Sequence, residues 1–132
     1  MAERLRILLV DDEPDILKMV GKRLESEGYE VSLAIDGEEA LEKIQEENPD
    51  LVILDIMLPK VNGFEVCRQL KQNSLHQGIP VILFTAMTQQ KDKRLGLECG
   101  ADAYVCKPFR TDELLDKIRE LARIGGNVKK DG

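Results

Sequence analysis

The feature that most constrains the fold of this chain is a repeated alternation of short apolar runs with segments of helical periodicity. Each run is four or five residues long and rich in β-branched side chains, which is typical of buried strands. Strands that alternate with helices of this length form parallel βαβ units. The pattern therefore predicts an α/β fold with a doubly wound, five-stranded parallel sheet covered by helices on both faces. The predicted strands are residues 7–10, 29–33, 51–54, 81–84 and 103–106.

Four of the five helical segments carry an apolar stripe that can cover the sheet. The first begins near Pro14, which suits the first position of a helix, and it ends at Gly28. The fourth, residues 88–99, has no such stripe, and its Gly96 costs about 1 kcal/mol relative to alanine in a helix interior. We therefore expect the fourth helix to be the most mobile one.

The length of 132 residues fits a single domain, which we place at residues 1–124. The fifth helix starts at the Thr111 cap and should end before Gly125, so residues 125–132 are expected to be a flexible tail or the stump of a linker. No apolar run approaches the roughly 18 residues of a transmembrane helix, and the start shows no signal peptide. We expect a cytoplasmic protein with no membrane partner.

The charge of the chain is acidic, with a net value of −6 and a pI near 4.9. Domains that bind nucleic acid generally show a basic stripe. Direct nucleic-acid binding is therefore not expected; if the protein regulates DNA, another module makes the contact.

The cysteines and the one histidine carry no clear functional signal. Cys67, Cys99 and Cys106 match neither a disulfide framework nor a zinc site, so we expect reduced, buried thiols. His76 lies alone among turn residues and is expected to be solvated, with no function.

Polar residues follow four of the predicted strands at their carboxyl ends, where open parallel sheets bind their ligands. Asp12 follows the first strand, Asp55 the third, Thr85 the fourth and Lys107 the fifth. Each alone has an ordinary interpretation, such as an N-cap for the acids. Together with Asp11 they provide a carboxylate to be attacked, two more to hold a metal, and a hydroxyl and an ammonium to hold the transferred group. The set predicts a magnesium-dependent phosphoryl acceptor site.

Five motifs, in order along the chain, carry a resemblance to a known family. The motifs are Leu8 to Glu13, Leu54 to Pro59 with Gly63 after it, Thr85-Ala86, Gly100 to Asp102, and Tyr104 to Phe109. Between Arg6 and Arg123 they resemble the receiver domain of two-component response regulators, and the chain is similar to the chemotaxis-type single-domain receivers. This resemblance implies a flavodoxin-like fold of five βα units with strand order 2-1-3-4-5.

The resemblance also implies a phosphoacceptor and a metal site. Asp55 would accept a phosphoryl group from a sensor histidine kinase, a phosphotransfer protein or a small phosphodonor. Asp12, Asp55 and the backbone carbonyl of Met57 would ligate Mg²⁺ or Mn²⁺, and Asp11 would hold a metal-bound water. Such a domain regulates a partner or output domain and is not an enzyme in the ordinary sense.

The switch residues follow from the same resemblance. Lys107 would pair with a phosphoryl oxygen, and the Lys107-Pro108 peptide would be cis. Thr85 would donate its hydroxyl to the phosphoryl group, and Tyr104 would turn inward as Thr85 moves. Phosphorylation would thereby favour an active form of the surface made by the fourth helix and the fifth strand.

Two departures from the family pattern bear on assembly and lifetime. Family members with a winged-helix DNA-binding module often carry two acidic residues where this chain has Asp102 and Ala103, so a monomer or weak dimer is expected. Met57 and Met87 are bulky at positions where water would approach the acyl phosphate, which predicts slow self-dephosphorylation.

Three alternatives stand beside this interpretation. A receiver fold can serve as an unphosphorylated interaction module. A phosphatase that forms an aspartyl phosphate would need an Asp-x-Asp loop after the first strand, where this chain has adjacent acids at Asp11 and Asp12. A flavin carrier would need a Ser/Thr-rich phosphate loop in the same place, and the acids there would repel phosphate.

Overall fold

The computed structural model describes residues 4–85, 98–106 and 111–131. All neighbouring strands within these residues pair in parallel, in the order β2-β1-β3-β4-β5. The predicted doubly wound sheet and its strand order are confirmed, and each strand bound agrees with its predicted position to within one residue. The strands are β1 (Arg6–Val10), β2 (Glu30–Ala34), β3 (Leu51–Leu54), β4 (Val81–Thr85) and β5 (Ala103–Cys106).

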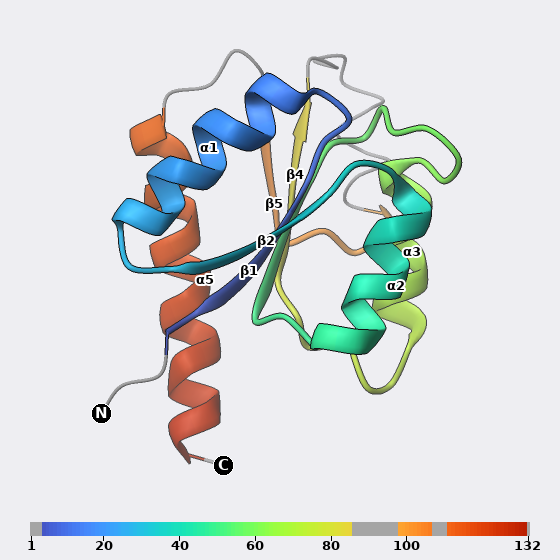
Figure 1. The fold of residues 1–132 in the computed structure, drawn as a ribbon. Helices are drawn as coiled ribbons and strands as arrows, with labels where there is room; N and C mark the ends of the chain where they lie inside the picture. Colours follow the sequence, from blue (N-terminus) through green and yellow to red (C-terminus); the bar gives the residue numbers. More distant parts are fainter. Residues whose placement is uncertain (1–3, 86–97, 107–110, 132) are drawn as a thin grey trace.

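Helices cover both faces of the sheet. In Figure 1, α1 (Pro14–Ser26) and α5 (Thr111–Asp131) lie on one side of the strands, and α2 (Gly37–Glu47) and α3 (Gly63–Gln72) lie on the other. None of the helices in the described residues is both long enough and apolar enough to cross a membrane. The predicted fourth helix falls outside the described residues except at its end, where only Glu98 is helical, so its mobility stays a prediction.

Two apolar clusters, one on each face, form the core. Successive residues of a strand point to opposite faces, so Leu8 and Val10 pack under α2 and α3, whereas Ile7 and Leu9 pack under α1 and α5. Every residue of β3 is fully buried. Because both faces are covered, the strands read as continuous apolar runs, and the central strands hold the residues that follow them in fixed positions.

The last helix is longer than its glycines indicated. It was expected to end before Gly125, but α5 runs on to Asp131. Extension of a formed helix adds one hydrogen bond for each residue that is ordered, which can offset the roughly 1 kcal/mol that each glycine costs. The prediction of a helix end at this point was therefore wrong.

The expectation that His76 is solvated was also wrong. The side chain is buried, at 7% exposure, in the connection between α3 and β4. The backbone N–H of His76 donates to the carbonyl of Asn73 at 3.0 Å, and the N–H of Ile79 donates to the carbonyl of His76 at 2.9 Å. These turns fold the connection back onto the domain. The polar residues around His76 were therefore a misleading guide to its exposure.

Gly37 is a position where the fold leaves no room for a side chain. It begins α2, and a Cβ atom there would lie 1.8 Å from the carbonyl oxygen of Val61, in the loop between β3 and α3. The start of α2 is thus seated directly on the backbone of that loop. By contrast, a Cβ at Gly21 in α1 would meet Leu33 Cδ2 at an ordinary 3.5 Å.

We expect Gly37→Ala to lower the free energy of unfolding by about 1–3 kcal/mol, because the added methyl group must displace backbone atoms. The matched control, Gly21→Ala, should raise it by about 0.4–1 kcal/mol, because alanine restricts the unfolded chain and favours the helix. Urea unfolding followed by circular dichroism measures both values. Equal effects of the two substitutions would contradict the close approach at Gly37.

Candidate functional site

Parallel pairing brings two acidic residues to the same edge of the sheet. Val10 of β1 lies opposite Leu54 of β3, so the next residues, Asp11 and Asp55, leave the sheet side by side. The backbone N–H of Asp55 donates to the carbonyl of Val10 at 3.1 Å, and that of Asp11 donates to the carbonyl of Ala34 at 3.1 Å. The ladder therefore continues by one step and fixes where both aspartates begin.

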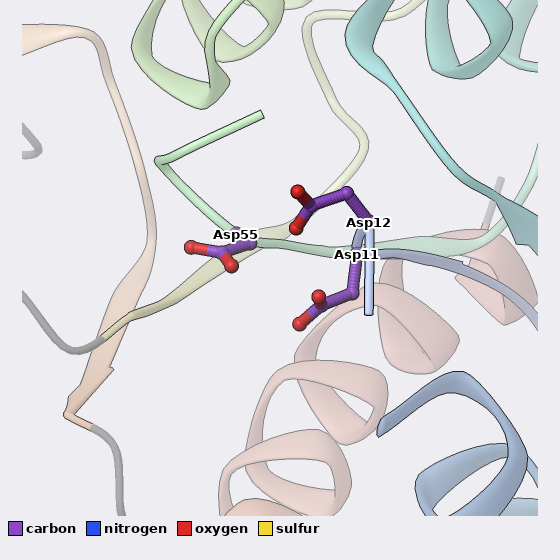
Figure 2. Close-up of side chains that lie close together, drawn as sticks. All are labelled: Asp11, Asp12 and Asp55. Atoms are coloured by element: carbon purple, nitrogen blue, oxygen red, sulfur yellow. The ribbon is translucent and has the colours of Figure 1, made fainter. Parts of the chain in front are cut away.

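Three carboxylates meet at this edge. One side-chain oxygen from each of Asp11, Asp12 and Asp55 lies within 4.8 Å of the others. Figure 2 shows the three side chains directed to the same side of the strand ends. Asp11 is fully buried and Asp55 is 5% exposed, whereas Asp12 is exposed. Three negative groups this close repel one another, so the cluster favours the binding of a cation that prefers oxygen ligands.

Short hydrogen-bonded turns orient the two buried carboxylates. Asp11 Oδ1 accepts a hydrogen bond from the backbone N–H of Glu13 at 2.8 Å, and Asp55 Oδ1 accepts one from the N–H of Met57 at 3.1 Å. Aspartate favours such turns because its side chain reaches the backbone two residues ahead. The local sequence thus supplies part of the site's rigidity.

Gly63 lies directly against the backbone of Asp55, a contact that the sequence did not indicate. A Cβ atom at Gly63 would lie 2.3 Å from the carbonyl oxygen of Asp55 and 2.7 Å from Cα of Ile56. The Gly63 N–H also donates to the carbonyl of Ile56 at 2.8 Å. Asn62, the residue before Gly63, caps α3 by accepting from the N–H of Glu65. No local pattern shows which backbone that glycine contacts.

The residues predicted to hold the phosphoryl group are only partly described. Thr85 ends β4, and its backbone pairs in register with Cys106 of β5, but its side chain lies outside the described part of the structure. Lys107 and Pro108 also lie outside it, so the lysine's position and the cis peptide stay predictions.

Two further predicted residues are placed. The Met57 side chain is 63% exposed, while its N–H faces Asp55 as described above. Tyr104 lies in β5, is partly buried, and packs against the core cluster on the side of α2 and α3. Tyr104 therefore belongs to the face opposite α1 and α5.

Known proteins share this sequence and this fold. Residues 7–119 match the family model of the response regulator receiver domain. The chain is 48% identical over 118 residues to the alkaline phosphatase synthesis transcriptional regulatory protein PhoP of Bacillus subtilis (strain 168), covering 89% of this chain and 48% of that protein. It is 46% identical over 120 residues to the DNA-binding response regulator MtrA of Mycolicibacterium smegmatis, covering 91% and 51%. The chain spans about half the length of the curated relatives it matches.

Solved structures agree with the sequence matches. A CheY-like response regulator receiver domain protein from Methanospirillum hungatei JF-1 superposes with a TM-score of 0.89 at 36% identity, covering 98% of this chain and all of that one. A putative response regulator from Chloroflexus aurantiacus J-10-fl gives a TM-score of 0.88 at 34% identity, covering 92% and 99%.

These relatives overturn one expectation. The acidic charge of the chain led us to exclude direct nucleic-acid binding, yet MtrA is named a DNA-binding response regulator and PhoP a transcriptional regulatory protein. The physical reason for the error is that net charge describes only the residues counted, and this chain matches about half of each relative. Net charge was therefore a poor basis for excluding a nucleic-acid partner.

The family model, the curated relatives and the solved structures all match over nearly the whole sheet and its helices. The acidic cluster lies at the carboxyl edge of that sheet, where the resemblance placed it. The chain belongs to the response regulator receiver domain family, the regulatory phosphoacceptor domains of two-component systems.

Proposed function

We propose that this domain is a phosphorylation-activated switch in which Asp55 accepts a phosphoryl group from a sensor histidine kinase. The observation that carries the proposal is the meeting of Asp11, Asp12 and Asp55 at the carboxyl edge of the sheet. In the reaction an Asp55 oxygen attacks phosphorus, a P–O bond forms, and the P–N bond to the kinase histidine breaks. Asp55 suits this role because its carboxylate is oriented by the N–H of Met57 and little exposed to water.

The cluster fits a small divalent cation such as Mg²⁺ or Mn²⁺, because it offers hard carboxylate oxygens within 4.8 Å of one another. Asp12, Asp55 and the carbonyl of Met57 would ligate it, with Asp11 acting through a water. When bound, the cation supplies positive charge that offsets the repulsion between the acids and the phosphoryl oxygens. Asp11, which is buried, keeps its place through its turn with Glu13.

The rest of the switch is proposed from positions along the strands. Thr85 and Cys106 end β4 and β5 in register, and Lys107 is the next residue in the sequence after Cys106. We propose that Lys107 and the Thr85 hydroxyl hold the phosphoryl group, that the Lys107-Pro108 peptide is cis, and that Tyr104 responds as the switch aromatic. The altered surface near β5 would then regulate a partner or an output domain.

The first test is covalent labelling with acetyl phosphate. The parent should gain the mass of one phosphoryl group in Mg²⁺ and none in EDTA, and Asp55→Asn should gain none. Asp15→Asn, which changes an acid in the first turn of α1 outside the cluster, should label like the parent. An unlabelled parent in Mg²⁺ would instead favour an unphosphorylated interaction module, and labelled Asp55→Asn would move the acceptor elsewhere.

The second test separates repulsion from metal binding. Without divalent cation, Asp12→Asn should be more stable than the parent, because one of three clustered charges is removed. At a Mg²⁺ concentration ten times the dissociation constant, the parent should gain about 1.4 kcal/mol of stability and Asp12→Asn much less. Thermal unfolding with and without Mg²⁺ measures both effects. The control is Glu42→Gln, an exposed acid of α2, which should respond to Mg²⁺ as the parent does.

The third test concerns the lifetime of the acyl phosphate. We expect Met57→Asn to shorten it at least about tenfold, equivalent to about 1.4 kcal/mol in the barrier, because a polar amide replaces an apolar side chain where water would attack. Met19→Asn is the matched control, since Met19 is similarly exposed on α1 at 58%, against 63% for Met57. Loss of label over time, followed by intact mass, gives the lifetimes. Equal lifetimes for the parent and Met57→Asn would remove this role for Met57.

A further inference from the structure

Two cysteines that are far apart in the sequence meet in the core. Cys67 lies in α3 and Cys99 lies 32 residues later, directly before the turn at Gly100. Both are buried, at 0% and 9% exposure. The Cys67 sulfur donates to the backbone carbonyl of Cys99 at 3.5 Å, which brings the two thiols close enough to affect each other's pKa. The fold thus creates a thiol pair that no spacing motif indicates.

The two thiols of this pair are chemically unequal. Interaction with the Cys67 thiol lowers the pKa of Cys99, and the backbone N–H of Ala101 and the charge of Lys71 act in the same direction against burial. The hydrogen bond with Cys99, together with burial, raises the pKa of Cys67. Thiolates are the reactive form of cysteine, so Cys99 has the character of an attacking sulfur and Cys67 that of its protonated neighbour.

Lys71 is held close to the pair by contacts of its own. It lies one helical turn after Cys67 on the same side of α3. Its ammonium donates to Asp102 Oδ2 at 2.9 Å and to the carbonyl of Ile79 at 2.8 Å. Its aliphatic stem lies against Gly100, where a Cβ atom would be 3.0 Å from Lys71 Cγ. The Lys71 charge lowers the pKa of both thiols, whereas the charge of Asp102, its ion-pair partner, raises that of Cys67, so the pair of charges favours ionisation of Cys99 over Cys67.

We infer that Cys67 and Cys99 form a reversible disulfide when the domain meets a peroxide, with Cys99 attacking and Cys67 resolving. Redox-sensing sites pair a low-pKa cysteine that solvent can reach with a resolving thiol, and Cys99, at 9% exposure, is the more accessible member of this pair. Cys106, in β5, takes no part in this pair. The inference goes beyond the proposed phosphorylation switch and does not depend on it, because no step involves Asp55.

The chemistry balances with peroxide as the only added reactant. The Cys99 thiolate attacks one peroxide oxygen, an S–O bond forms, the O–O bond breaks, and the departing hydroxide takes up a proton as water. The Cys67 sulfur then attacks the Cys99 sulfenic acid, an S–S bond forms, the S–O bond breaks, and hydroxide leaves with the Cys67 proton as a second water. Two thiols are oxidised to one disulfide, and one peroxide is reduced to two waters.

The position of the pair gives the disulfide a structural effect. It would join α3 to the chain just before β5, which begins at Ala103 and carries Tyr104. A crosslink that closes a loop of this length also restricts the unfolded chain. Oxidation should therefore raise the midpoint of thermal unfolding and restrain the start of β5.

The test is hydrogen peroxide treatment of the full chain, followed by alkylation and non-reducing peptide mapping. We expect a linked pair of peptides containing Cys67 and Cys99, loss of two of the three thiols, and full recovery with a thiol reductant. Cys106→Ser, the matched control, should form the same disulfide. Asp55→Asn should oxidise like the parent, which separates a failure here from a failure of the phosphorylation proposal.

Variants of the pair identify the order of events. Cys67→Ala should stop at a sulfenic acid on Cys99 that a dimedone-type reagent traps, and Cys99→Ser should leave Cys67 unmodified. If a variant fails to fold by circular dichroism, the mapping of the parent alone still decides. Three intact thiols at a peroxide concentration that fully oxidises free cysteine, or a crosslink through Cys106, would overturn the inference.

Discussion

The register between β1 and β3 is the constraint on which the site depends. Helices cover both faces of the sheet. A shift of one residue in the strand pairing would therefore move each apolar side chain of the strand to the cluster on the opposite face. The core thereby fixes the hydrogen bond from Asp55 to Val10, and that bond sets Asp55 beside Asp11. Apolar packing thus sets where Asp11 and Asp55 leave the sheet, and the turns that their own side chains make with Glu13 and Met57 set how the carboxylates are oriented.

The acidic cluster opposes the stability of the domain that carries it. Asp11 and Asp55 are almost fully buried beside a third carboxylate, and a buried charge is costly unless hydrogen bonds or a cation compensate it. The turns at Glu13 and Met57 supply some of that compensation from the backbone. Packing alone gives no reason to keep three acids here. The proposed cation and incoming phosphoryl group would account for three acids at this edge.

Local chemistry explains what the sequence could predict. The strands and most helix ends depend on residues within one or two turns, such as Pro14 at the start of α1 and Asn48, whose left-handed φ of 48° ends α2. The misses have a non-local cause. The burial of His76 and the meeting of Cys67 with Cys99 are set by tertiary packing between segments that no short window contains. The end of α5 depends on helix propagation. The exclusion of nucleic-acid binding relied on the net charge of this chain, which matches only about half the length of its relatives.

The acids and the thiol pair lie at opposite edges of the sheet. Cys99 precedes the amino end of β5, whereas Asp11 and Asp55 follow the carboxyl ends of β1 and β3. Lys71 ties the amino end in place through Asp102, whose carboxylate also accepts from the N–H of Val81 at the start of β4. Two sites influence each other only if both bias one element with two arrangements. The core cluster that contains Cys67 and Cys99, with Tyr104 packed against it, also contains Val10 and Leu54, the residues before Asp11 and Asp55. Any coupling between oxidation and phosphorylation would pass through this shared packing, because the covalent chemistry of the two sites has no atom in common.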